Sequence, residues 1–586
     1  MAEKLLKEHL YGDLLAPSIG YSTDFALGMT YSLSFEALLT AHMAFGMLGE
    51  MDDYVMQSRH MLLEAITKSS DKVVVFCNKG GIVVPSTIRK IYSLMERNIF
   101  EVFDKKNHKA NFHPKLWLIR EINNENKKDI LLKLIVTSRN LAYTDTVDCI
   151  ACLTGNVGTK SVKNEKHHPL IDFIKSVVKE SIIGDEQKKA ILRLASDLER
   201  VEKFDVEAPF EDYDFFPYLF DYDFDIPKVE DYLVGMESII VSPFIDTRMI
   251  SRLNPDNRSK RTLITRKEFV NKRIFNKFKD KGGIFVTLDD LASRGMDLHA
   301  KMYHVWNGRD EQYLYLGSAN ATASAFERNG EFLLRLKYKY GNTRSAQFLS
   351  SFYEENDRDC KFMPLYEASE NASSANKWDI AETAMKDLMC AGDLKARITH
   401  HHNGNYSIVV TSNIRSLSNN VYIAPLQKKN YIQRWTGRAV FENMKIEELS
   451  EFYILSATAP DGLYHEAVVK IKTTGIPYNR DVEIYKSILK TPKDFFRFLE
   501  LMLTDTPTQY MSSEIFLKET DENEARTFES HIFPNLYEKM LKTAATNPKQ
   551  IQEIGRLISK LSDDVVPSAF TQIYSQPLKR SIGQTS

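Results

Sequence analysis

Apolar runs and helical patterns alternate along the first 175 residues of the chain. "DKVVVFCNKGGIVV", from Asp71, and "LLKLIVTSRN", from Leu131, are apolar, rich in β-branched residues and end in polar residues. Such runs are typical of buried strands. "EALLTAHMAFGMLGEM" and "STIRKIYSLMERN" carry apolar residues at helical spacing. The alternation predicts an α/β domain with a mixed or parallel sheet.

A second alternation of the same kind begins at "SIIVSPFID", from Ser238, and ends near residue 345. Between the two, the segment from Phe204 to Tyr232 interleaves acidic and aromatic residues, with Lys228 as its only basic residue. Two interpretations stay open for this segment. The favoured one is an ordinary linker whose aromatic rings pack on the core. The other is a segment that imitates nucleic acid and restrains the chain by occupying or bordering its own phosphate site.

The pattern changes again after residue 380. "YSIVVTS", "NNVYIAPL", "EFYILSAT" and "YHEAVVKIKT" predict antiparallel strands of a small β domain, and "YIQRWTGR" predicts an exposed aromatic and basic surface on it. "TPKDFFRFLELML" predicts a helix with Thr491 as N-cap and Pro492 at its first position. We expect these domains: a first half over 1–178, a helical and acidic-aromatic connector over 179–235, a second half over 236–345, a β-rich accessory domain over 346–475 and a helical region over 476–586.

Composition narrows the class of protein. The chain has 586 residues and a net charge of −2, so any basic surface has to be local. We expect no signal peptide, because the charged start "MAEKLLKEHLYGDLL" lacks an apolar core, and no membrane span. The five cysteines are scattered, which favours a reducing compartment. We therefore expect a cytoplasmic protein without a membrane partner, and its oligomeric state stays open.

One set of polar residues occurs twice in the same order. His113 and Lys115, in "HPK", are followed by Ser138 and Asn140 at the end of a strand, and then by Asp148. The second set, in "HAK", "GSAN" and "NGEFLL", comprises His299, Lys301, Ser318, Asn320 and Glu331. A histidine and a lysine two positions apart in extended chain project together, and burying two such cations without a partner is unfavourable. The pair therefore predicts an anion at this site.

The repeated set resembles the phospholipase D superfamily over roughly residues 20–345. The motif of that family has an Asp five residues after the Lys, where this chain has Arg120 and Trp306. The pattern is therefore more similar to tyrosyl-DNA phosphodiesterases and to the bacterial nucleases and restriction-type enzymes of the family. The resemblance implies an α/β fold, with two mixed-sheet halves in a duplicated phospholipase D-like sandwich, to which β-rich and α-helical C-terminal domains are appended.

The resemblance also implies roles for these residues. One imidazole attacks phosphorus and forms a phosphohistidine, and the other protonates the leaving oxygen and then activates water. By analogy His113 is the nucleophile and His299 the acid–base, although the reverse stays open. The two lysines and the two asparagines of the motifs donate to the phosphate oxygens, Asp148 and Glu331 orient the histidines, and Ser138 and Ser318 orient the site. No metal or other cofactor is expected.

A basic, aromatic stretch precedes the second motif. It predicts a helix with Lys272, Arg273, Lys277 and Lys279, which forms either a wall of a nucleic-acid channel or an ordinary solvated face. The leading hypothesis is a nuclease that cuts nucleic acid, DNA above all, in a bacterial defence or restriction system, with an ATPase or helicase as partner protein. The alternatives are a phospholipase D-type lipid hydrolase or transferase, and a non-catalytic module that grips phosphates.

Overall fold

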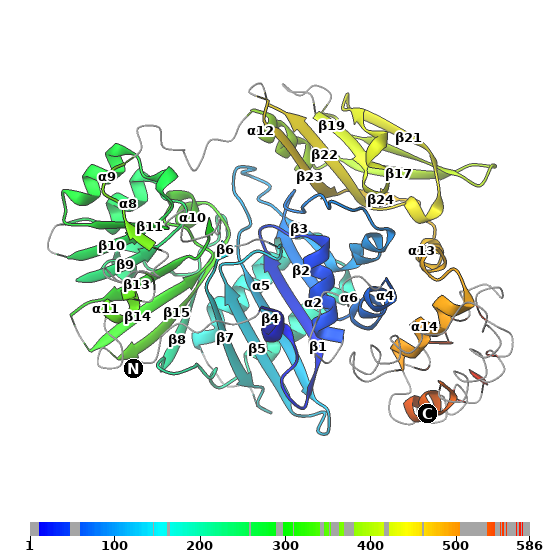
Figure 1. Ribbon diagram of the computed structural model, residues 1–586, viewed down its shortest axis with the longest axis horizontal. Helices are drawn as coiled ribbons and strands as arrows, with labels where there is room; N and C mark the ends of the chain where they lie inside the picture. The colour runs from blue at the N-terminus through cyan, green and yellow to red at the C-terminus, as the bar shows by residue number, and fades with distance from the viewer. Residues whose placement is uncertain are drawn as a thin grey trace.

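Two mixed β-sheets lie face to face at the centre of the computed structural model (Figure 1). The first sheet has the strand order β3-β2-β1-β4-β5-β7. The structure describes residues 11–46, 59–143, 146–160, 165–256, 259–288, 297–308, 310–339, 345–350, 352, 362–368, 380–414, 421–459, 462–503 and 536–544, and a few single positions after 550. The strands of the first sheet are β1 (Tyr21–Thr30), β2 (Val73–Asn78), β3 (Ile99–Val102), β4 (Leu116–Asn123), β5 (Ile130–Thr137) and β7 (Ile150–Asn156).

The second sheet has the strand order β16-β11-β10-β9-β13-β14-β15-β8. Its strands are β8 (Asp212–Tyr218), β9 (Glu237–Val241), β10 (Lys260–Ile264), β11 (Ile284–Leu288), β13 (Met302–Trp306), β14 (Glu311–Gly317), β15 (Glu331–Lys339) and β16 (Phe362–Pro364). The run β11-β10-β9-β13-β14-β15 has the same connectivity as the first sheet. In both sheets the first three strands are parallel and the next three follow antiparallel. The predicted α/β class is confirmed.

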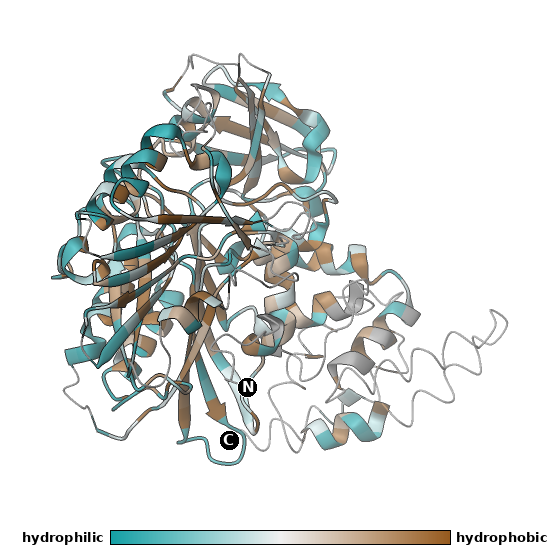
Figure 2. Cartoon of the chain, turned by 60° about the vertical axis from the view of Figure 1, so that its left-hand side comes forward, coloured by the Kyte–Doolittle hydropathy of each residue, from teal (hydrophilic) through white to brown (hydrophobic). Residues whose placement is uncertain are grey.

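Helices cover the outer faces of both sheets. In β1, Leu27 and Met29 face the core between the sheets, whereas Ala26 faces helices, because alternate residues of a strand point to opposite faces. The hydrophobic residues are concentrated along the central strands (Figure 2). The layers are therefore helix, sheet, sheet, helix. The covering helices are α2 (Phe35–Gly46) and α4 (Arg59–Ser69) on the first sheet, α7 (Val229–Leu233), α8 (Thr247–Leu253) and α9 (Lys272–Lys279) on the second, and α5 (His168–Glu180) and α6 (Asp185–Leu198) beside the shared core.

Two short pairings tie the sheets together where the motifs lie. Strand β6 (Thr146–Val147) of the first half pairs in parallel with β12 (Asp297–Leu298) of the second half. Phe112 forms the corresponding parallel bridge with Gly330. Each segment that precedes a motif histidine is thus joined to the segment that precedes the acid of the other half.

The acidic and aromatic connector contributes a strand to the second sheet. Strand β8 forms its edge and pairs antiparallel with β15, and the Tyr213 ring is buried. Asp212 forms an ion pair with Lys166, and Asp214 forms one with Arg335. The favoured interpretation of a packed linker therefore describes β8, and the idea that these two acids occupy the phosphate site is wrong.

The accessory region contains two four-stranded sheets that pack on each other and on helix α12 (Ile380–Met389). It docks on the first half, where Val468 bridges Ile82. The predicted exposed surface is wrong for Trp435, which is 5% exposed and donates from Nε1 to the Ile414 carbonyl over 2.7 Å. The strands are β17 (Lys395–His400), β18 (Tyr406–Thr411), β21 (Arg438–Met444) and β24 (Lys472–Thr474) in one sheet, and β19 (Val421–Pro425), β20 (Gln433–Arg434), β22 (Phe452–Thr458) and β23 (Tyr464–Lys470) in the other.

Helices α13 (Arg480–Ile488) and α14 (Pro492–Met502) follow the accessory region. The predicted cap of α14 is present, because the Thr491 hydroxyl accepts the backbone N–H of Asp494 over 3.1 Å. Much of the predicted helical region after residue 503 lies outside the described residues. Within the part of the chain that the structure describes, every helix is too short or too polar to cross a membrane.

Candidate active site

Both predicted histidine–lysine pairs lie in extended segments that lead directly into a strand. His113 and Lys115 precede β4, and His299 and Lys301 precede β13. The register of the sheets makes the two pairs equivalent: Leu116 pairs with Met29 at the end of β1, and Met302 pairs with Val241 at the end of β9. The equal connectivity of the two sheets therefore brings both pairs to corresponding ends of equivalent strands, β4 in the first sheet and β13 in the second.

Each histidine contacts a carboxylate that comes from the other half of the molecule. His113 Nδ1 lies 2.9 Å from Glu331 Oε2, and His299 Nδ1 lies 2.8 Å from Asp148 Oδ1. The cause is the pairing between the sheets: the His113 amide donates to the Gly330 carbonyl and the His299 amide donates to the Val147 carbonyl, one residue before each acid. With Nδ1 held by a carboxylate, Nε2 of each ring is the atom left for chemistry.

The two motif serines hold the carboxylates in place. The Ser138 hydroxyl donates to Asp148 Oδ1 over 2.7 Å and accepts the Cys149 amide over 2.9 Å. The Ser318 hydroxyl donates to Glu331 in the same way and accepts the Phe332 amide over 2.9 Å. Both serines are fully buried. Each one therefore orients its own half's acid, and that acid orients the other half's histidine.

The motif lysines are fully buried and lie beside the histidines. Lys115 Nζ is 3.0 Å from His113 Nε2, and Lys301 Nζ donates to the His299 carbonyl over 2.6 Å. Burial and the nearby Lys301 lower the pKa of Lys115 well below its usual value. Burial also lowers the pKa of Lys301, to about 8. Two mutually repelling ammonium groups in a buried site favour the binding of an anion between them.

Asn140 and Asn320 lie in the turns that follow β5 and β14. Asn140 Oδ1 accepts the Ser32 amide over 3.3 Å. Asn320 Oδ1 is buried, and no donor among the described residues reaches it. The turns themselves are held alike, because the Leu141 amide donates to the Thr30 hydroxyl and the Ala321 amide donates to the Ser242 hydroxyl.

Both histidines are neutral in the free site. Burial, Lys115 and Lys301 lower the pKa of His113 well below its usual value. Burial and Lys301 lower the pKa of His299 to about 3, although the hydrogen bond to Asp148 opposes that shift. A neutral imidazole can act as a nucleophile or as a base, and an anion bound beside it raises its pKa.

The two carboxyl groups differ in acidity although they hold equivalent positions. Burial raises the pKa of Glu331 to about 8, despite the lowering effect of Lys115. Burial also acts to raise the pKa of Asp148, but hydrogen bonds from His299, Thr146 and Ser138 outweigh it and hold that pKa at about 2. Asp148 is therefore ionised at neutral pH, and its charge stabilises a protonated His299.

Two residues near the motifs were not found by sequence reasoning. The Tyr31 ring lies 5.0 Å from the His113 ring, centroid to centroid, at the end of β1. Arg266, at the end of β10, donates from Nε to the Leu298 carbonyl over 2.9 Å and forms an ion pair with Asp297. Both follow strands at the edge where the motifs lie, and that position is the signal that could have identified them.

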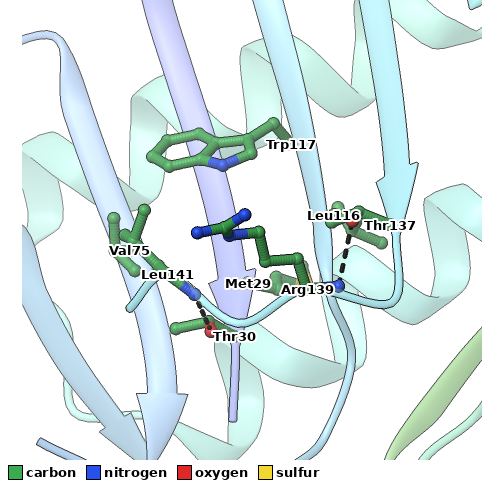
Figure 3. A pocket seen from close by; sticks show the side chains of 8 residues that line it. All are labelled: Met29, Thr30, Val75, Leu116, Trp117, Thr137, Arg139 and Leu141. Carbon is green, nitrogen blue, oxygen red and sulfur yellow. Dashed lines mark hydrogen bonds between the residues drawn. The ribbon is translucent and has the colours of Figure 1, made fainter. Parts of the chain in front are cut away.

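Other predicted or motif residues lie away from the histidines. Arg120, at the position of the missing family Asp, forms buried ion pairs with Asp197 and Asp24. Arg139 lies between Ser138 and Asn140, yet its side chain points toward Trp117 in the close view (Figure 3). Its backbone amide donates to the Thr137 hydroxyl over 2.9 Å. We therefore assign both arginines a structural role in the first half.

The four predicted nucleic-acid-binding cations lie on α9, in the outer helical layer of the second sheet. Ile274, Phe275 and Phe278 of this helix are buried in that layer, as its apolar stripe requires. The cations occupy the exposed face of α9, and they are Lys272, Arg273, Lys277 and Lys279. Arg266, in the segment that precedes this helix, contacts the Leu298 carbonyl next to the second motif. The binding role of these cations stays a prediction.

Comparison with known proteins gives a partial likeness in structure only. No family model matches the chain, and no curated protein matches it. Among solved structures, yeast tyrosyl-DNA phosphodiesterase matches with 11% identity and a TM-score of 0.35, over 57% of this chain and 86% of that one. A mutant of the same yeast enzyme matches with 13% identity and a TM-score of 0.36, over 57% and 87%. The functional proposals rest on the site geometry.

Proposed function

We propose that the chain is a phosphodiesterase of the phospholipase D type that hydrolyses nucleic acid without a metal. The observation that carries this proposal is the double contact across the two sheets: His113 with Glu331, and His299 with Asp148, each beside a buried lysine. Two histidines with ordered Nδ1 atoms supply two Nε2 atoms for the reaction, and two ammonium groups supply the positive charge that a phosphodiester requires.

The reaction proceeds in two displacements. In the first, Nε2 of one imidazole attacks phosphorus, an N–P bond forms, and the P–O bond to the leaving group breaks as the other histidine gives that oxygen a proton. In the second, the now neutral histidine takes a proton from water, the water oxygen attacks phosphorus, and the N–P bond breaks. Lys115 and Lys301 stabilise the charge on the phosphoryl oxygens in both steps.

The difference between the two acids supports the assignment of roles. A general acid has to carry a proton when the leaving group departs, and ionised Asp148 favours the protonated form of His299. Glu331 has a raised pKa, and so it favours protonation of His113 less. We therefore assign His113 as the nucleophile and His299 as the acid–base.

The proposal also covers the domain architecture and the class of substrate. The shared connectivity of the two sheets supports a duplicated phospholipase D-like sandwich with appended β-rich and helical regions. The second sheet extends past the expected boundaries at both ends, because it includes β8 from the connector and β16 from beyond residue 345. The preference for nucleic acid over lipid draws on the basic face of α9. Roles in bacterial defence and with an ATPase or helicase rest on the sequence resemblance alone.

An assay on labelled DNA and RNA, single-stranded and duplex, tests the proposal. We expect cleavage of at least one of these substrates by the purified chain, and loss of at least 100-fold in rate for His113→Asn and for His299→Asn. The Lys127→Ala variant is a suitable control, because Lys127 lies in the exposed turn between β4 and β5, at the far end of β4 from His113. Equal rates for the wild-type and histidine variants would reject the proposal.

A further inference from the structure

A cavity of about 460 Å³ lies between the loop over residues 105–109 and helix α12. The loop has the sequence "KKNHK", and the helix contributes Thr383, Lys386 and Asp387. The cavity is therefore lined by lysines from both sides, with the carboxylate of Asp387 as the one acid among its described lining residues. Such an excess of positive charge around a hollow favours an anionic ligand.

The lysines of this loop are either exposed or held only by weak surface pairs. Lys106 is 80% exposed and lies 3.3 Å from Asp221, which is itself 70% exposed. Lys105 is 60% exposed and lies 3.8 Å from Glu180. Pairs of this kind contribute little and are readily replaced by a stronger anion such as phosphate. The loop can therefore exchange its acidic neighbours for a ligand.

The cavity lies close to the first motif of the candidate active site along the chain. Lys109 precedes His113 by only four positions, so a fully extended chain separates their Cα atoms by at most about 14 Å. Lys386 donates to Asn111 Oδ1 over 2.8 Å, two residues before His113. The charge of Glu382, on the same helix, also acts on Tyr31, the ring beside His113.

We infer that this cavity, named here the loop–α12 pocket, binds backbone phosphates of a nucleic-acid strand adjacent to the phosphate that is cut. The inference rests on the proposed function, because it assigns the flanking part of the substrate of that site. Because Lys109 lies at most about 14 Å from His113, the next few phosphates of one strand can reach the end of the pocket that Lys109 lines. The three lysines of the loop then bind neighbouring phosphates as point charges.

The experiment compares a long and a short substrate in a variant without the loop lysines. The variant carries Lys105→Ala, Lys106→Ala and Lys109→Ala, and the probes are a fluorescent 15-nucleotide DNA and the chromogenic diester bis(p-nitrophenyl) phosphate. We expect at least tenfold weaker DNA binding at 50 mM salt, and a salt slope reduced by about 2 for three lost contacts. Hydrolysis of the small diester stays within twofold, because that diester does not reach the pocket.

Two further variants test whether the effect is specific to the pocket. Lys127→Ala with Lys128→Ala removes two exposed lysines from the far end of β4 and leaves the salt slope unchanged. Asp221→Asn removes the acidic neighbour of Lys106, so DNA binding becomes tighter, most clearly at low salt. Unchanged thermal unfolding of every variant shows that the fold is intact.

The outcomes separate this inference from the proposed function. Cleavage of the small diester together with unchanged DNA binding in the loop variant overturns the pocket and leaves the phosphodiesterase standing. Weaker DNA binding in the loop variant, when the wild-type chain cuts neither probe, supports the pocket and rejects the catalytic proposal. Weaker binding to anionic lipid vesicles with unchanged DNA binding assigns the pocket to lipid and overturns the inference.

Discussion

The imidazole of His299 lies 2.8 Å, from Nδ1 to Oδ1, from the carboxylate of Asp148, which is 151 residues away and belongs to the other half of the molecule. The mirror contact joins His113 to Glu331 over 2.9 Å. Neither half can therefore orient its own histidine, and a competent site requires both halves to be docked. The two contacts differ in the acidity of the carboxyl group.

That difference predicts unequal effects of removing the two charges. Asp148→Asn removes the group that favours protonated His299, so we expect the maximal rate to fall by roughly 100-fold or more. The pKa of His299 also falls further, so the pH above which the rate declines moves downward. Glu331→Gln keeps a hydrogen-bonding partner for His113 and removes less charge, so we expect a smaller fall in the maximal rate. Measuring the cleavage rate as a function of pH for both variants tests this prediction.

Glu327→Gln is the matched control for these two variants. Glu327 is a nearby acid on α10 (Ala323–Glu327), and it pairs with Arg248 and Arg252 on the surface rather than with a histidine. Its substitution leaves the pH profile unchanged. A larger loss in Glu331→Gln than in Asp148→Asn would reverse the assignment of nucleophile and acid.

We predict that cleavage continues in EDTA. The buried lysines of both motifs supply the kind of positive charge that a metal ion supplies in metal-dependent hydrolysis, and their charge needs no cofactor. The measurement is the rate of DNA cleavage after dialysis against EDTA, and then after addition of magnesium. A rate that falls in EDTA and returns specifically with magnesium would contradict the proposed chemistry.

The elements and the motif residues were largely accessible from the sequence, because their signals are local. The buried run "VVVFCN" became β2, whose six residues are all buried. His, Lys, Ser, Asn and acid could be identified because their order repeats. Trp435 was misjudged because its basic neighbours suggested exposure, whereas the ring packs in the core of the accessory sheets and its N–H donates to the Ile414 carbonyl.

The pairing of acids with histidines could not be predicted, because it depends on contacts between the halves. Strand β6 meets β12, and Phe112 meets Gly330, over separations that no sequence period reveals. Tyr31 and Arg266 were missed for a related reason: each is a single residue at the end of a strand. Only the packing of the two sheets places them beside the motifs.

The exposed face of α9 gives a prediction for binding. If it forms a channel wall, replacing Lys272, Arg273, Lys277 and Lys279 by Ala flattens the log–log salt dependence of nucleic-acid affinity by roughly 0.7 to 0.9 for each lost contact. The buried Ile274 and Phe278 stay in place, so the helix remains folded. Fluorescence anisotropy from 50 to 300 mM salt measures the slope. An unchanged slope assigns α9 to an ordinary solvated surface.

Gly317 gives a prediction for stability. Its φ of +151° and the Phe332 carbonyl oxygen, which would lie 2.2 Å from an added Cβ, leave no room for a side chain. Gly317→Ala should therefore destabilise the chain by about 2 kcal/mol or more and displace the neighbouring Ser318. Gly392→Ala is the control, because an added Cβ there meets nothing within 4 Å. Equal urea midpoints for both variants would contradict this account.

The lowered lysine pKa values predict that an anion brings protons with it into the site. In the free site Lys301 has a pKa of about 8, against an ordinary value of 10.5, because burial disfavours its charge. Inorganic phosphate or vanadate bound between Lys115 and Lys301 favours both charges and raises both pKa values. At pH 7 Lys301 is mostly protonated and contributes little uptake. At pH 9 it is mostly neutral when free and charged when bound, so proton uptake increases between pH 7 and pH 9.

Calorimetric titration in buffers of different ionisation enthalpy measures this uptake directly. Lys301→Arg is the matched control, because a guanidinium keeps its charge at pH 9 and so removes the increase that Lys301 causes. Glu331, with a pKa of about 8, and the two histidines also respond to a bound anion, but they are present in both chains, so the difference between the wild-type chain and Lys301→Arg isolates Lys301. An increase in uptake between pH 7 and pH 9 that is the same in both chains would mean that Lys301 is not beside the bound anion, and the proposed arrangement of the site would then be wrong.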